Sequence, residues 1–152
     1  MKQLQFDFDN VPGIDYAYAI PLSSFRRVRH DYAIGKNALE VRDRDKIIRI
    51  ESFNDKFSFQ EKKSQSDGGD FWDVSIRVSV PKLFSANEDL IHQLERNTWL
   101  VLFRNKNGSV ILSGTVDIPL VCSSSKNADN GVELVFSAKQ ENPSIFVSTD
   151  ID

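Results

Sequence analysis

The sequence predicts a mainly β protein, an antiparallel sandwich or barrel of about seven strands with one short flanking helix. Three observations predict this fold. Apolar and polar residues alternate over much of the chain, eleven of its 152 residues are Phe, and turn-forming residues recur between the alternating segments. Alternation places one face of a strand on a core and the other in water, as in antiparallel sheets. Phe and β-branched residues favour such half-buried pleated surfaces.

Seven segments carry the strand signal. Period-two alternation is clearest in 72–80, where the residues on one face are Trp72, Val74, Ile76, Val78 and Val80. The same period runs through 14–20 and 132–138. The shorter candidates are 46–53, 56–62, 99–103 and 110–120. Strands at this spacing, separated by turns, are expected of a sandwich or barrel.

Three connections are predicted between these strands. The segment 64–70, SQSDGGD, joins 56–62 to 72–80, and its paired glycines supply positive φ at little cost. The segment 104–109, RNKNGS, closes a hairpin in which Gly108 is the left-handed residue. The segment 122–131 is interpreted as a longer polar loop. Consecutive hairpins of this kind predict a meander.

One helix is expected at 86–96. Ser85 and Glu88 have the spacing of a capping box, which satisfies backbone donors at a helix start. Its apolar stripe consists of Leu90, Ile91 and Leu94. A single short helix with one apolar stripe is expected to lie across an open end or edge of the sheet.

The segment 21–45 is the least regular part of the chain. It holds either a strand near 38–41 or a long loop. Loops longer than ~12–15 residues in compact domains are usually functional or disordered. This segment is therefore the first place to look for a binding role.

Charge is unevenly distributed. The net charge of −3 argues against general nucleic-acid binding, which depends on neutralising phosphates. Segment 26–49 nevertheless holds eight basic residues against four acidic ones, a local charge of +4, so the rest carries −7. This asymmetry fits an anionic partner, a contact between unlike patches of two subunits, or simply solvated charge. The basic residues are Arg26, Arg27, Arg29, Lys36, Arg42, Arg44, Lys46 and Arg49.

Catalytic chemistry finds little support in the sequence. The possible nucleophiles are Cys122 and the serines at 123–125, and His30 and His92 are the only histidines. Neither histidine belongs to a nucleophile elbow or a cysteine-protease signature. A triad assembled in space would make the protein a hydrolase, which stays open as a third hypothesis. We expect that it is not an enzyme and has no catalytic residue.

No metal or cofactor is expected. One cysteine and two distant histidines do not have the spacing of a zinc site. The pair Asp7 and Asp9 could open a calcium loop, but the following residues do not continue it. The acids around Gly68 and Gly69 could bind a cation weakly, although Asp is also a preferred turn residue. Motifs that cradle phosphates are missing from the sequence.

The chain is expected to form a single domain, 1–152, with flexible tails at 1–10 and 148–152. Its length suits one sizeable core. One cysteine excludes an internal disulfide, and the sequence contains no apolar run of membrane-spanning length. We therefore expect a protein of the cytosol, or one released by lysis, with no membrane partner.

The order of the elements resembles a known group of proteins. VPGI at 11–14 precedes the basic segment, and a Phe-x-Phe-x-Glu strand at 57–61 precedes the long strand from Trp72. The helix, NGSVILSG and VELVFSAKQENP follow, so the similarity spans 11–147. This order resembles small virion or tail-associated proteins from prophage-like regions of gut bacteria, and the plan is similar to that of phage tail-tube subunits.

The resemblance implies a non-enzymatic structural protein of a phage or prophage particle. Such a subunit would form a homo-oligomer or join other virion proteins, and would be cytoplasmic in the host before entering the virion. The alternative is a monomeric binding module that recognises an anionic ligand or partner through segment 26–49. The candidate partner or subunit contacts are Arg26, Arg27, Arg29, Arg42, Arg44, Asp67, Gly68, Gly69 and Asp70.

Overall fold

The computed structural model describes residues 13–32, 36–51, 57–80, 85–127 and 131–148. In these ranges the protein is mainly β, with antiparallel strands and one α-helix, which confirms the predicted fold class. Eleven strands are described, more than the seven expected. The elements are β1 (Ile14–Pro21), η1 (Leu22–Ser24), β2 (Phe25–Asp31), β3 (Lys36–Val41), η2 (Arg44–Lys46), β4 (Ile48–Glu51), β5 (Phe57–Ser66), β6 (Gly69–Val80), α1 (Ser85–Arg96), β7 (Thr98–Asn105), β8 (Val110–Ser113), β9 (Leu120–Asn127), β10 (Gly131–Gln140) and β11 (Ile145–Val147).

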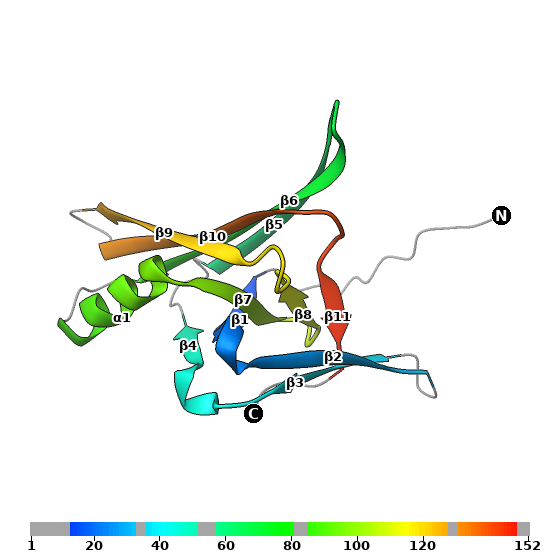
Figure 1. Cartoon of the computed structure of the whole chain (residues 1–152). Coiled ribbons are helices and arrows are strands. Elements are labelled where there is room, and N and C mark those ends of the chain that lie inside the picture. The colour runs from blue at the N-terminus through cyan, green and yellow to red at the C-terminus, as the bar shows by residue number, and fades with distance from the viewer. Residues whose placement is uncertain (1–12, 33–35, 52–56, 81–84, 128–130, 149–152) are drawn as a thin grey trace.

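Strand β7 organises the main sheet, because three other strands pair with it. On one edge Thr98 and Trp99 pair with β9, and residues 101–104 pair with β8. The other edge pairs with β1, which also pairs with β4. The sheet therefore divides at β7 into the layers β4-β1-β7-β8-β11 and β9-β10-β6-β5. This is a sandwich-like arrangement, and the β2–β3 hairpin lies on its far side from β5 and β6 (Figure 1).

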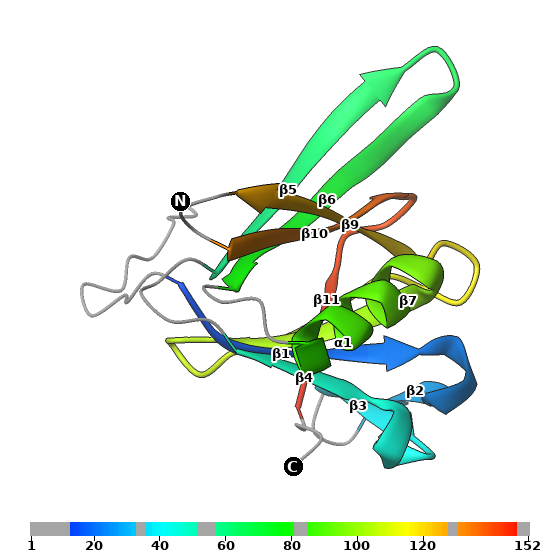
Figure 2. The same cartoon turned by 90° about the vertical axis from the view of Figure 1, so that its left-hand side faces the viewer.

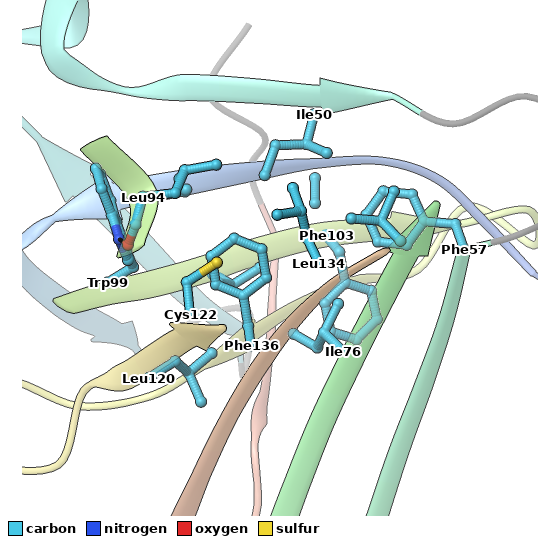
Figure 3. Packing of buried hydrophobic residues seen from close by; sticks show 14 of the residues in the cluster. Ile50, Phe57, Ile76, Leu94, Trp99, Phe103, Leu120, Cys122, Leu134 and Phe136 are labelled. Atoms are coloured by element: carbon cyan, nitrogen blue, oxygen red, sulfur yellow. Dashed lines mark hydrogen bonds between the residues drawn. The ribbon is translucent and has the colours of Figure 1, made fainter. Parts of the chain in front are cut away.

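The main core fills the space between these two layers. Alternate residues of β6 and β10 point into it, and the cross-strand pair Ile76 and Phe136 is 1% exposed at both positions. Strand β7 contributes Trp99 and Phe103 from the opposite layer, and Cys122 of β9 lies beside Phe136, its opposed residue on β10 (Figure 3). Each fully buried large apolar side chain stabilises the fold by about 1.5–3 kcal/mol.

A second apolar cluster lies on the other face of β1 and β7. It contains Leu100 and Leu102 of β7 with Tyr18 and Ile20 of β1. The β2–β3 hairpin covers this cluster with side chains that include Phe25, Val28, Leu39 and Val41. Strand β7 is thus buried on both faces, which explains why WLVLF is a continuous apolar run and does not alternate.

Helix α1 packs beside β9, and its observed bounds confirm the helix expected at 86–96. Ile91 and Leu94 enter the main core, but Leu90 is 42% exposed, so the predicted three-residue stripe is wrong at that position. Trp99 Nε1 donates a hydrogen bond to the Leu94 carbonyl at 2.8 Å, which holds the end of the helix on β7. The side chain of Ser85, and so its predicted cap, is outside the described residues.

The segment 21–45 is a hairpin, β2–β3, flanked by two 3-10 turns, and β3 contains the strand that was one of the two expectations, near 38–41. Alternation failed to reveal it because the pairing register shifts between Phe25 and Arg27. This bulge places the two core-facing residues of β2, Phe25 and Val28, three positions apart.

The predicted tails are described only at Ser148. The backbone N–H of Ser148, at the start of the expected C-terminal tail, donates to the Asn37 carbonyl at 2.7 Å. Residues 1–12 and 149–152 lie outside the described part.

Two further strand predictions are corrected. The expected strand 110–120 is interrupted, because β8 ends before Gly114, whose φ of +90° turns the chain. The expected polar loop 122–131 is largely strand β9, in which Leu120 and Cys122 are buried while Val121, Ser123 and Ser125 are exposed. The predicted hairpins β5–β6 and β7–β8 are both observed, and Gly108 has the expected positive φ, +89°.

Candidate interaction surfaces

The possible catalytic residues lie in different environments. Cys122 is buried at 4% exposure in the main core, and desolvation raises the pKa of its thiol to about 12. His30 lies on β2, beyond the second apolar cluster, and its Nδ1 is 2.8 Å from Asn37 Oδ1. His92 is exposed on α1. A thiol so resistant to ionisation is a poor nucleophile at neutral pH.

Two of the carboxylates near the glycine turn, those of Asp70 and Asp73, have protein partners. Lys63 Nζ forms an ion pair with Asp70 at 3.5 Å, and Ser64 Oγ donates to Asp73 at 3.1 Å. Across the ranges that the structure describes, no group of three or more His, Cys, Asp or Glu residues could hold a metal ion.

The first candidate surface is the outward face of the β2–β3 hairpin. Arg27 donates to Glu40 across the two strands at 2.7 Å, and Arg29 Nε is 3.8 Å from the same carboxylate. The hydrogen bond from Arg27 lowers the pKa of Glu40, and the paired carboxylate raises the pKa of Arg27. Two guanidinium groups therefore share one carboxylate, and Arg26 beside them is exposed.

The other basic residues of segment 26–49 are spread around this hairpin. Arg42 Nε donates to the Ser23 carbonyl at 2.9 Å, and Arg44 begins the turn η2, so both lie at the base of the hairpin. Arg49 of β4 pairs with Glu51 at 2.9 Å and lies over the Tyr16 ring at 4.3 Å. Arg42 and Arg49 thus help to hold local structure, and the predicted basic segment does not form one compact site.

The second candidate surface is the far end of the β5–β6 hairpin, here called the arm and defined as residues 64–71. Strand β10 supports β6 only as far as the pair Gln140 and Trp72. Beyond that point β5 and β6 continue as a two-stranded ribbon that projects from the body of the protein (Figures 1 and 2). The tip is the turn Asp67-Gly68, so most of the connection predicted at 64–70 is strand.

The arm carries mainly polar side chains. At the tip, Ser66 Oγ donates to the Gly69 carbonyl at 3.1 Å, and Gly69 has a φ of +118°. Residues 65–70 are all exposed. Lys139 of β10 lies over the ring of Phe71 at 5.0 Å, at the base of the arm. The arm is therefore a sparsely packed extension, without the concave apolar lining that small-molecule sites have.

A feature that sequence reasoning missed is the free edge of β5. It is the last strand of its layer, and within the described ranges no strand pairs with its second edge. The sequence gives only a weak signal for this part of β5. Its polar run, Gln60 to Ser66, lacks alternating apolar residues and is as typical of a loop as of a strand.

The structure separates the predicted contact residues into two groups. Arg26, Arg27, Arg29, Arg42 and Arg44 belong to or flank the β2–β3 hairpin, and Asp67, Gly68, Gly69 and Asp70 form the tip of the arm. These groups lie on opposite sides of the protein in both views (Figures 1 and 2). Any shared function would have to use them as two separate contacts.

Comparison of the chain with protein-family models, with curated proteins and with solved structures found no match. The single helix of the described residues, α1, is too short and too polar to cross a membrane.

Proposed function

We propose that this chain is a non-enzymatic structural subunit that assembles with its neighbours into an oligomer. The observation that carries the proposal is the arm, which extends a strand edge and a polar tip beyond the support of β10. A projecting ribbon with an open edge offers main-chain hydrogen bonds to another chain. Ordering such an extension costs conformational entropy, and its own few packing contacts offset little of that cost. A contact with a neighbouring chain would supply the missing stabilisation.

The particle that this subunit belongs to is proposed from the order of its elements, which resembles tail-associated proteins of phages and prophages. In that setting the chain would be made in the host cytoplasm and would end in the virion. The two separate candidate surfaces suit a structural subunit, because a subunit within an assembly meets neighbours on more than one side.

Light scattering after size exclusion tests the self-assembly, measured from micromolar to near-millimolar concentration. We expect a molar mass above that of one chain, rising with concentration. The comparison is a shortened-arm variant in which an Asn-Gly turn replaces residues 65–70. It joins Ser64 to Phe71, an opposed pair two steps from the native turn, so the turn geometry is kept. Unchanged self-association of this variant would exclude the arm as part of the interface. A wild-type protein that stays monomeric at every concentration would refute the proposal.

A second candidate function is the binding of an anionic ligand or partner at the β2–β3 hairpin. The observation in its favour is that Arg27 and Arg29 share the single carboxylate of Glu40, which leaves excess positive charge on an exposed face. Retention on a heparin column tests it. Arg26→Gln with Arg29→Gln should strongly weaken retention without lowering the melting temperature, because Arg26 is exposed and Arg29 is held only by a 3.8 Å ion pair. Retention that does not vary with salt would exclude this function.

A further inference from the structure

We propose that β5 of one copy pairs antiparallel with β5 of a second copy across a two-fold axis, with Lys62 opposite its own counterpart. The inference rests on the proposed self-assembly and names its interface. Strand β5 spans Phe57–Ser66, and β6 pairs with it along its whole length from one side only. Among the residues that the structure describes, no strand pairs with its second edge, which therefore presents a row of backbone N–H and C=O groups that a matching strand can satisfy.

The geometry of the sheet restricts how two β5 strands can meet. Opposed residues of an antiparallel pair point to the same face, and side chains change face at every residue. A two-fold pair must therefore be centred on a residue and not between two. Only centres at Glu61 or Lys62 keep nearly the whole ten-residue strand paired.

Charge distinguishes these two registers. A centre at Glu61 places two Glu61 carboxylates opposite each other, which is destabilising. A centre at Lys62 places Glu61 of each copy opposite Lys63 of the other, which gives two complementary pairs. The two Lys62 side chains then face each other, but each is opposite Asp73 on its own β6, which offsets their repulsion. Charge complementarity therefore favours the register centred on Lys62.

The existing contacts of these side chains are compatible with this pairing. The Glu61 carboxylate accepts the Ser144 backbone N–H at 3.1 Å, and a carboxylate can accept further bonds. Lys63 is half exposed and pairs with Asp70 at 3.5 Å, a surface contact of low energy. Both groups can therefore turn toward a second copy without leaving a buried charge unpaired.

The same register gives the arm a structural partner. Residues 64–66 of each arm lie opposite residues 58–60 of the other copy, so each unsupported ribbon end is held by the body of the other copy. These opposed side chains are short or flexible, and they are polar except for Phe59, which is half-buried. The layer β9-β10-β6-β5 would then continue through the axis into its counterpart as one sheet.

A charge-reversal experiment tests this interface. Glu61→Lys alone and Lys63→Glu alone each turn both complementary pairs into repulsive ones, so each variant should self-associate at least about tenfold more weakly than wild type. A 1:1 mixture of the two restores both pairs, because one copy then carries two lysines and the other two glutamates. We expect the mixture to form a heterodimer in light scattering. Glu61→Gln keeps an acceptor for the Ser144 N–H and removes only the charge. It therefore separates the effect of the charge from that of the hydrogen bond.

Cysteine variants test the register independently of charge. In a Cys122→Ala background, Lys62→Cys should oxidise to a covalent dimer faster than Glu61→Cys or Lys63→Cys, because only residue 62 meets its own counterpart. Fastest coupling at residue 61 would overturn the register. Oligomers of the wild type that neither the mixture nor Lys62→Cys affects would refute this interface but leave the proposed function standing. A strictly monomeric wild type would refute both.

Discussion

Replacing Trp99 with Phe tests how the helix is held on the sheet. The Trp99 side chain is 1% exposed, and its indole N–H donates to the Leu94 carbonyl at 2.8 Å (Figure 3). Leu94 lies in the last turn of α1, where backbone carbonyls have no partner within the helix. The indole therefore satisfies a buried acceptor that the helix itself leaves open.

The expected cost follows from two losses. A buried carbonyl without its donor costs about 1–3 kcal/mol. The smaller Phe ring also leaves unfilled space in the core, which adds a fraction of the 3–5 kcal/mol that complete truncation of a buried aromatic costs. We expect the free energy of unfolding to fall by about 2–4 kcal/mol, a large share of the ~5–15 kcal/mol typical of a domain.

Urea unfolding followed by far-ultraviolet circular dichroism measures this loss. Trp72→Phe is the matched control, because Trp72 is only half-buried near the start of β6, and we expect it to cost less than about 1 kcal/mol. The dependence of the unfolding free energy on urea concentration should be similar in both variants. Equal losses in the two variants would refute the argument that the indole N–H anchors the helix.

Three further predictions concern backbone strain and titration. Gly114→Ala should destabilise the protein by about 2 kcal/mol or more, because φ is +90° and a Cβ would lie 3.1 Å from a leucine methyl group. Gly69→Ala, with φ +118° and open space around it, should cost less in the same unfolding assay. Cys122, with a pKa of about 12 against 9.0 for the unfolded thiol, should resist iodoacetamide at pH 8 in the folded protein. Its contribution to stability is intact below pH 9.0 and is lost as the pH rises toward 12, a loss that Cys122→Ala should remove. Arg27→Gln should raise the lowered pKa of Glu40, measured by a carbon-detected NMR titration. The Glu40 contribution is present at neutral pH and is lost as the pH falls through this lowered pKa, so an unchanged titration would contradict the pairing.

The parts of the fold that could be predicted are those where burial on one face leaves a local pattern. Strands β6 and β10 each keep one face on the main core, so alternation located both strands, and their partners such as Ile76 and Phe136 are opposed as that pattern requires. The helix was located because its apolar spacing and its start signal are both local in sequence.

The rest depends on pairing between distant segments. A single bulge after Phe25 shifts the apolar period of β2, so the hairpin resembled a loop. Strand β9 presents serines to solvent, and serine favours turns as readily as an exposed strand face. Whether β5 is an edge strand depends on which other strands pair with it, and in the described part of the chain only β6 does. No local pattern in a sequence encodes such long-range pairing.

The two candidate surfaces predict different responses to salt, which can separate their roles in one assembly. Pairing of β5 strands would depend mainly on backbone hydrogen bonds, which added salt screens little. A contact made by the basic β2–β3 hairpin with an acidic surface would weaken steeply as salt is added, because salt screens charges that are exposed to solvent. Strand β5 and the β2–β3 hairpin lie on opposite sides of each copy, so a two-fold pair joined along β5 would leave both hairpins open to further contacts (Figures 1 and 2). If both surfaces act, higher oligomers should dissociate first to dimers as salt rises, and the dimers should persist.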